Sequence, residues 1–228
     1  MIQAVLFDMD GLMFDTERLS VQAWDYAGEK LGVGKAGYLV PTALGLSRPA
    51  WHRLWAEEFG SRYDEQRLDS GLREFYDRFY AENPVPVKPG LYELLAFLKD
   101  RKLLTAVVSS TPEKKVRRLL ESAEADRFFD LVLGGDRVER SKPDPEIYRT
   151  ACDRLNVRPD DCLVLEDSRN GLLSAYRAGC RPVMIPDLWQ PDEEISALLY
   201  AKLDSLAQVP GLLHQRGLLS EGTEKPGR

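Results

Sequence analysis

Short runs of apolar residues recur along this chain of 228 residues, and each run ends in a cluster of polar side chains. The runs do not alternate apolar with polar residues, which is typical of strands covered on both faces of a parallel sheet. Segments with apolar residues at helical spacing separate the later runs. Strand and helix therefore alternate, and we predict an α/β fold with a doubly wound parallel sheet. The predicted strands are residues 2–7, 103–108, 131–133, 162–165 and 182–185.

The first connection departs from this alternation. Between the first two predicted strands the chain carries about three helical patterns and no strand pattern. Such a segment is too long for a loop, so we predict that residues 15–86 form a small helical domain on two hinges. A helical layer packed rigidly on the sheet is the alternative. Residues 1–14 and 87–217 would then form the α/β core, and residues 218–228 a loose tail.

Composition excludes several classes of function. The chain has 31 Lys and Arg against 37 Asp and Glu, a formal charge of −6, whereas nucleic acids and anionic membranes attract basic surfaces. Three cysteines without a C-x-x-C pair favour a reducing compartment, and two histidines leave little for a histidine triad. No apolar run could span a bilayer and the first residues lack a basic lead, so the expected location is cytoplasmic.

Polar side chains follow the predicted strands at the edge where open α/β sheets bind ligands. Asp8 and Asp10 come directly after the first strand, and residues two apart on an extended chain point to the same side. Ser109 and Ser110 follow the second strand, shortly before a proline that favours the start of a helix. Hydroxyl groups and free N–H groups at a helix N-terminus predict an anion site.

Further charged residues follow the third and fourth strands. Lys142 precedes a proline that we expect to begin the next helix, which would place the lysine ammonium at the rim of the site. Glu166 and Asp167 end the fourth strand. Each residue alone is typical of a helix cap or a solvated surface, but four carboxylates at one edge repel each other and raise their own pKa values unless a cation lies among them. Magnesium takes such an all-oxygen set of ligands.

Four segments resemble the motifs of the haloacid dehalogenase superfamily, in the order in which that family carries them. They are the run F-D-M-D-G-L-M-F-D-T-E at residues 7–17, V-V-S-S at 107–110, S-K-P-D-P-E-I-Y around Lys142 and L-E-D-S-R-N-G at 165–171. The helical insertion falls where the subgroup of β-phosphoglucomutase and small-metabolite phosphatases carries its cap domain. The resemblance implies a Rossmann-like core and phosphoryl transfer through an aspartyl-phosphate.

The resemblance also implies a role for each motif residue. Asp8 would be the nucleophile and Asp10 the general acid and base. The implied magnesium ligands are Asp8, the Asp10 carbonyl and Asp167, with Glu166 as a further ligand or a neighbour of the ion. The implied phosphate-binding groups are Ser109, the Ser110 N–H and Lys142. Metal and lysine would neutralise charge on the phosphoryl group while the carboxylate attacks it.

Residues of the insertion would choose the substrate. The segment L-G-L-S-R that ends at Arg48 resembles the cap loop of mutases and sugar-phosphate phosphatases. Arg48 is the main candidate, with Ser47, Trp51 and His52 beside it, although a solvated helix N-terminus also accounts for this arginine. The mutases carry a histidine where this chain has Ser20, which favours hydrolysis over isomerisation.

The predicted function is therefore a magnesium-dependent phosphatase for a small phosphorylated metabolite, either a sugar phosphate or a nucleotide-like monoester. A mutase of the β-phosphoglucomutase type is the alternative. A phospho-accepting signalling module is a candidate from another class, but such modules carry the acceptor on a middle strand and lack the insertion. We expect a monomer or a weak homodimer that binds neither nucleic acid nor membrane.

Overall fold

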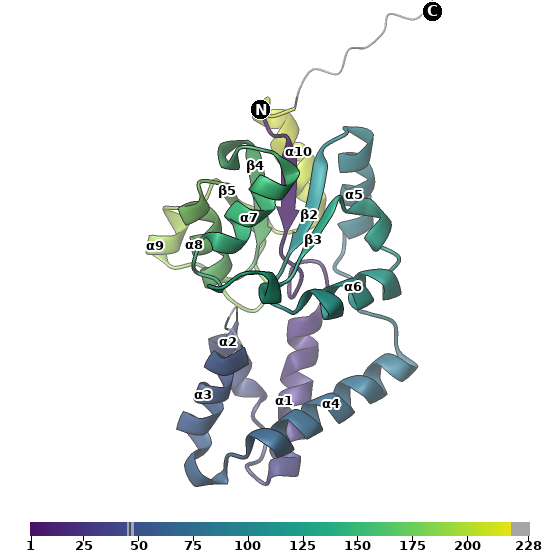
Figure 1. Ribbon diagram of the computed structural model, residues 1–228. Coiled ribbons are helices and arrows are strands. Elements are labelled where there is room, and N and C mark those ends of the chain that lie inside the picture. Colours follow the sequence, from purple (N-terminus) through teal and green to yellow (C-terminus); the bar gives the residue numbers. More distant parts are fainter. Residues whose placement is uncertain (45, 47, 220–228) are drawn as a thin grey trace, which may run out of the picture.

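The computed structural model describes residues 1–44, 46 and 48–219 of the chain. Within them, parallel strands form a single sheet in the order β3-β2-β1-β4-β5-β6 (Figure 1). The strands are β1 Ala4–Phe7, β2 Leu104–Val108, β3 Leu131–Leu133, β4 Cys162–Glu166, β5 Arg181–Met184 and β6 Ala201–Lys202. The predicted α/β class and all five predicted strands are confirmed. Strand β6 was not predicted, because two residues at the sheet edge leave no apolar run.

Strand β1 lies between β2 and β4, so the order of the strands reverses beside it. Ala4 pairs with Leu104 on one side and with Cys162 on the other. Open α/β sheets bind ligands at the carboxyl ends of the strands around such a reversal. This register brings the polar clusters that follow β1, β2 and β4 to one edge.

Helices cover both faces of the sheet. Side chains alternate along β1, so Val5 and Phe7 pack on one layer of helices while Ala4 and Leu6 pack on the other. The first layer comprises α5 Leu91–Asp100, α6 Glu113–Ser122 and α10 Val209–Gln215. The second comprises α7 Glu146–Leu155 and α8 Arg169–Ala178, and the short α9 Glu193–Ser196 packs against α8. Single 3-10 turns occur at Gly37–Leu39, Gly60–Arg62, Asp126–Phe128, Gly135–Arg137, Pro159–Asp161 and Leu206–Gln208.

The helices between β1 and α5 gather beyond the carboxyl ends of the strands, at the bottom of Figure 1. We call them the cap helices: α1 Thr16–Leu31, α2 Val40–Ala43, α3 Arg48–Phe59 and α4 Glu65–Glu82. They share an apolar cluster that includes Trp24, Ala27, Trp55 and Leu68, separate from the clusters around the sheet. A side chain at Gly71 of α4 would press on Ala27 of α1, so the glycine lets these helices approach closely. The domain bounds at residues 15 and 86 stay a prediction.

The chain enters and leaves the cap helices through two segments that pair with each other. Phe14 forms an antiparallel bridge with Val87, and the Asp15 N–H donates to the Pro86 carbonyl at 2.8 Å. The Lys88 N–H donates to the Met13 carbonyl at 2.9 Å. We call this pair of segments the paired crossing.

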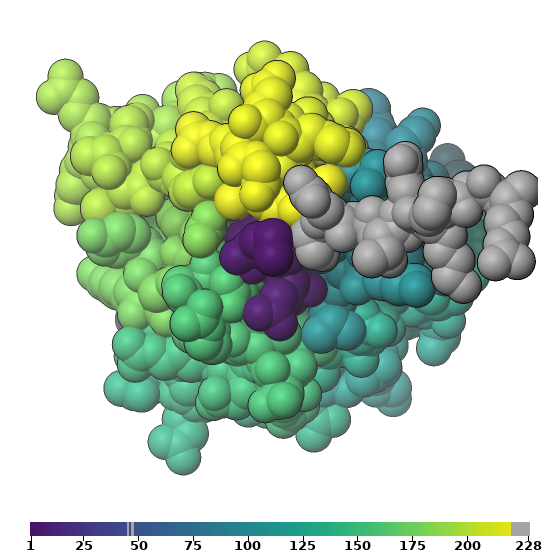
Figure 2. All heavy atoms as spheres, turned by 90° about the horizontal axis from the view of Figure 1, so that it is seen from above, coloured from purple at the N-terminus to yellow at the C-terminus, as the bar shows by residue number. Residues whose placement is uncertain are grey.

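The C-terminal residues of the described chain pack beside the N-terminus. Figure 2 shows this end of the molecule, with the N-terminal residues in purple next to the C-terminal residues in yellow. The Ile2 N–H donates to the Leu218 carbonyl at 2.9 Å, and the Leu218 side chain is buried. The prediction of a loose tail is therefore wrong at Leu218, because this leucine joins the core, and residues 220–228 lie outside the described residues. None of the described helices is long and apolar enough to cross a membrane.

Candidate active site

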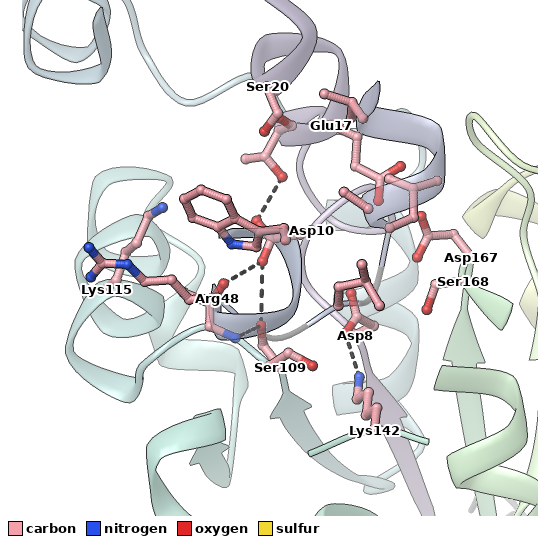
Figure 3. A pocket seen from close by; sticks show the side chains of 18 of the residues that line it. Asp8, Asp10, Glu17, Ser20, Arg48, Ser109, Lys115, Lys142, Asp167 and Ser168 are labelled. Carbon is pink, nitrogen blue, oxygen red and sulfur yellow. Dashed lines mark hydrogen bonds and ion pairs between the residues drawn. The ribbon is translucent and has the colours of Figure 1, made fainter. Parts of the chain in front are cut away.

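A cavity of about 410 Å³ lies between the carboxyl ends of the strands and the cap helices. Residues that follow β1, β2, β3 and β4 line it, together with side chains of the cap helices (Figure 3). Of the predicted residues it contains Asp8, Asp10, Ser20, Arg48, Trp51, Ser109, Ser110, Lys142 and Asp167. The topology therefore brings together residues that are distant in the sequence: Asp8 and Asp167 are 159 positions apart.

A glycine makes the turn from β1 into this cavity possible. Gly11 has a φ of +81°, and a Cβ atom there would lie 2.2 Å from Asp167 Oδ2. Any larger residue would be strained in this backbone conformation and would displace the carboxylate. The chain can therefore bring Asp8 and Asp10 under Asp167 only with glycine at this position.

Lys142 is buried beneath the cavity instead of lying at its rim, so that prediction is wrong. Its ammonium donates to Asp8 Oδ1 at 2.6 Å, to Glu166 Oε1 at 2.7 Å and to the Val108 carbonyl at 3.0 Å. These three acceptors draw the side chain inward. The next helix also begins later than predicted, at Glu146. Burial by itself lowers the pKa of Lys142, but Asp8 and Glu166 outweigh it and hold the pKa above its usual value, so the lysine is charged.

Glu166 is fully engaged within the protein. Besides Lys142, the Tyr148 hydroxyl donates to its Oε1 at 2.8 Å, and the Ser168 hydroxyl donates to Oε2 at 3.0 Å. The Asp167 and Ser168 N–H groups also donate to Oε2, each at 3.2 Å. Glu166 therefore anchors Lys142 and the start of α8.

The remaining carboxylates of the site carry an excess of buried negative charge. Burial raises the pKa of Asp8 to about 7, although Lys142 opposes this shift. Burial, together with Asp187, Asp10 and Asp8, raises the pKa of Glu17 to about 9. The pKa of Asp167 is raised well above its usual range, first by burial and then by Glu17 and Asp8. The site is therefore short of positive charge.

Several oxygens of these site carboxylates have no hydrogen-bond partner among the described residues. They are both carboxylate oxygens of Asp167 and Oε2 of Glu17, all buried. Asp8, Glu166 and Asp167 each offer an oxygen that lies within 4.8 Å of the other two. Buried carboxylates need a cation or a hydrogen bond, and hard divalent cations bind oxygen ligands of this kind. The donor set therefore fits a magnesium ion.

Asp10 is held by hydroxyl groups from both sides of the cavity. Thr16 donates to its Oδ1 at 2.8 Å, and Thr111 donates to its Oδ2 at 2.8 Å. Ser109 adds a longer contact of 3.4 Å to Oδ2. In the view of Figure 3, Asp10 lies between Ser20 and Ser109 and faces the same space as Asp8.

The predicted cap residues divide between two cavities. Ser20 lines the site, where its hydroxyl contacts the Thr16 carbonyl at 2.8 Å and the Tyr76 hydroxyl at 2.9 Å. Arg48 and Trp51 also line it, whereas His52 is absent from its lining and borders a second cavity beside α3. Ser47 lies outside the described residues.

The sequence model of the haloacid dehalogenase-like hydrolases matches residues 2–179, which is most of the chain and spans every strand-end residue of the site. This protein belongs to the haloacid dehalogenase-like hydrolase family. The predicted family and the prediction of a hydrolytic enzyme are confirmed. The assignment decides against the phospho-accepting signalling module.

Characterised relatives of this hydrolase extend over most of its length. It is 32% identical to the phosphorylated carbohydrates phosphatase of Thermotoga maritima over 78% of this chain and 82% of that protein. It is 30% identical to hexitol phosphatase B of Escherichia coli over 91% of this chain and 94% of that protein. The crystal structure of CbbY from Rhodobacter sphaeroides with phosphate superposes with a TM-score of 0.74, at 29% identity, over 92% of this chain and 96% of that one.

Several residues that line the hydrolase cavity were not predicted from the sequence. Thr16 and Glu17 belong to the first motif, and their position at the start of α1, directly after the strand-end aspartates, was the available signal. Thr111 follows Ser110 and was equally close to a known motif. Tyr76 and Lys115 gave no signal, because the cavity gathers them from helices far apart in the sequence.

Proposed function

We propose that this hydrolase removes the phosphoryl group from a small phosphorylated metabolite, with a sugar phosphate as the favoured class. The observation that carries the proposal is the position of Asp8. Lys142 holds its Oδ1 at 2.6 Å, while the residue lines a cavity beside Asp10. A carboxylate that is oriented by a buried lysine and open to a cavity is suited to attack a phosphate monoester.

Asp8 and Asp10 would carry the two half-reactions. An Asp8 oxygen attacks phosphorus, the bond between phosphorus and the ester oxygen breaks, and protonated Asp10 donates its proton to that oxygen. Asp10, now a carboxylate, then takes a proton from water, and the water oxygen attacks the phosphorus of the aspartyl-phosphate. The bond between phosphorus and Asp8 breaks, which releases phosphate and restores the carboxylate.

Three residues would stabilise the negative charge on the phosphoryl oxygens. Lys142 supplies a permanent positive charge beneath Asp8, and the Ser109 hydroxyl and Ser110 N–H supply hydrogen-bond donors from the end of β2. These groups lie on the core of the fold, so they can act on any phosphate monoester. Selectivity would come from the cap helices.

Asp8, Asp167 and the Asp10 carbonyl would hold a magnesium ion. When bound, magnesium neutralises negative charge on the phosphoryl group and on the carboxylates around it. Glu166 offers a carboxylate to the same cluster, but Lys142, Tyr148 and Ser168 already engage both of its oxygens. We therefore assign Glu166 to the support of Lys142.

The names of the relatives support a phosphorylated carbohydrate as the substrate class. Two of them are named as phosphatases of phosphorylated carbohydrates and of hexitols. A cavity of about 410 Å³ is within the range of small-molecule sites. Ser20 supports hydrolysis over isomerisation. The mutases carry a histidine at this position, and a serine that is hydrogen-bonded to Tyr76 cannot take up and release a proton as a histidine does.

The test is phosphate release from a panel of sugar phosphates, hexitol phosphates, nucleotides and phosphorylated small acids in the presence of magnesium. The Asp8→Asn variant should lose at least about a thousandfold in turnover with the fold retained, whereas Asp153→Asn, an exposed change on α7, should leave turnover unchanged. β-Glucose 1-phosphate belongs in the panel: formation of glucose 6-phosphate without phosphate release would establish the mutase instead. Turnover that survives Asp8→Asn would reject the mechanism.

A further inference from the structure

A second group of ligand-type side chains lies on the cap helices, away from the catalytic residues. His52 comes from α3, and Glu65 and Asp69 come from α4. The His52 Nε2 atom is 3.5 Å from Asp69 Oδ1 and 3.8 Å from Glu65 Oε1, and the three ligand atoms all lie within 4.8 Å of one another. His52 and Glu65 border the second cavity, which has a volume of about 360 Å³.

These distances are close to those of a tetrahedral metal site. Bonds of about 2.0–2.1 Å at tetrahedral angles place neighbouring ligand atoms roughly 3.4 Å apart. The measured separations from Nε2 exceed this value by only a few tenths of an ångström. Glu65 and Asp69 are four residues apart on α4, so they project from the same face of the helix. The cavity beside them leaves room for a water molecule as fourth ligand.

The hydrogen bonds of His52 fix the tautomer that a metal requires. The Arg48 Nε–H can only donate, and it points at His52 Nε2 over 3.3 Å, so Nε2 carries a lone pair. The proton of the neutral ring therefore lies on Nδ1, which donates to the Tyr63 hydroxyl at 2.6 Å. Histidine ligands of metals are oriented by such a bond from the second nitrogen. His52 is 8% exposed, so the ring is held in this orientation by burial as well.

We propose that His52, Glu65 and Asp69 form a binding site for a divalent transition-metal ion of the zinc type. A nitrogen ligand together with two carboxylates favours such an ion over magnesium, which prefers oxygen ligands alone. The site is separate from the carboxylates around Asp8. No catalytic step of the proposed function depends on it.

Binding at this site requires Arg48 to move. The guanidinium group of Arg48 pairs with Asp69 and contacts His52 Nε2, so it now supplies the positive charge of the cluster. A metal ion bound to Nε2 would lie within a few ångströms of that group, where two positive charges repel each other strongly. Because Arg48 also lines the catalytic cavity, the ion would free the arginine for that cavity.

Trp51 gives the experiment a signal that does not depend on turnover. Its ring stacks on His52 with ring centroids 4.0 Å apart and planes 23° apart. We would titrate the full-length protein with zinc chloride and follow tryptophan fluorescence, with magnesium in excess to fill the oxygen site. The expected result is one saturable change with one zinc ion bound per chain by equilibrium dialysis. The inactive Asp8→Asn protein should give the same titration, so failure of the proposed function and failure of this site are distinguishable.

Two variants decide whether the assigned residues are the ligands. Glu65→Gln alters a side chain that is 62% exposed, so the fold should persist, and His52→Gln removes the nitrogen ligand. Each should weaken zinc affinity by at least about tenfold. Glu57→Gln, an exposed change on α3, should leave the affinity unchanged. Unchanged affinity in Glu65→Gln and His52→Gln, or no saturable change in the unmodified protein, would mean that the cluster is only an ion pair between Arg48 and Asp69.

Discussion

The hydroxyl of Thr16 donates a 2.8 Å hydrogen bond to Asp10 Oδ1, which ties the first residue of α1 to the carboxylate beside Asp8. Thr111 donates an equally short bond to the other oxygen from the opposite side of the cavity. Asp10, the proposed general acid and base, is therefore held by Thr16 of the cap helices and by Thr111, which follows β2. Its orientation depends on both parts of the molecule.

Removal of one of these bonds should slow the chemical step. We expect Thr111→Val to lower kcat about tenfold with little change in KM, because a misplaced carboxylate transfers protons less well while phosphate binding is retained. Steady-state kinetics on the best substrate of the panel would measure this. Thr42→Val, an exposed change on α2, is the control and should behave like the unmodified enzyme. Equal loss of kcat in both variants would contradict the assignment.

Lys142 should be essential for both stability and turnover. Lys142→Met leaves Asp8 and Glu166 buried without their cation, and a buried pair broken in this way costs about 3–5 kcal/mol. We expect a matching fall in the free energy of unfolding by urea and a loss of turnover greater than about a thousandfold. Lys114→Met, at an exposed position of α6, should change neither quantity. A Lys142→Met protein as stable as the unmodified one would show that the ion pairs contribute no net stability.

The buried Glu17 should make the metal-free protein less stable as pH rises. Its pKa is raised from 4.5 to about 9, so the folded state favours the protonated form. The stability that this group contributes is fully present below pH 4.5 and is lost as pH rises toward 9. A rise of one in pKa corresponds to about 1.4 kcal/mol. We therefore compare the free energy of unfolding of Glu17→Gln with that of the unmodified protein, in EDTA. The difference should shift in favour of the variant by at least about 2 kcal/mol between pH 5 and pH 9. A constant difference across this range would count against the shift.

Magnesium should raise the melting temperature by a route that depends on Asp167. Both oxygens of this residue are buried without a partner among the described residues, so a bound cation relieves charge that only the folded state confines. Binding at one hundred times Kd stabilises a protein by about 2.7 kcal/mol, which is several degrees for a domain of this size. Calorimetry with and without EDTA at pH 8 would measure the rise. In Asp167→Asn the rise should largely disappear, although the metal-free variant itself should melt higher than the unmodified protein.

The sequence was informative about the strands and the residues directly after them. An apolar run followed by Asp8 or by Ser109 determines locally where a strand ends, and parallel pairing then brings these ends to one edge. Lys142 shows the limit of such reasoning. Its burial depends on three acceptors that converge only in the folded chain: Asp8 directly after β1, Val108 of β2 and Glu166 of β4. No local pattern contains that information.

Three of the cap helices were predictable as helices but not in their contacts, and the four-residue α2 was not predicted. Periodicity identified α1, α3 and α4, yet the pairing of Arg48 with Asp69 follows from the way α3 packs on α4. Tyr76 likewise reaches the catalytic cavity through the packing of α4 beside α1. Relations between helices depend on side-chain packing over the whole cluster, which a single sequence does not specify position by position.

The paired crossing constrains how the cavity can admit and release molecules. Because the segments around Asp15 and Pro86 are hydrogen-bonded to each other, they must deform together, as one ribbon and not as two independent tethers. A ribbon bends and twists readily but resists stretching and sideways shear. We therefore expect the cap helices, where they move relative to the sheet, to rotate about an axis near Phe14 and Val87. Access would be widest on the rim farthest from that axis, which gives the cavity a defined direction of entry.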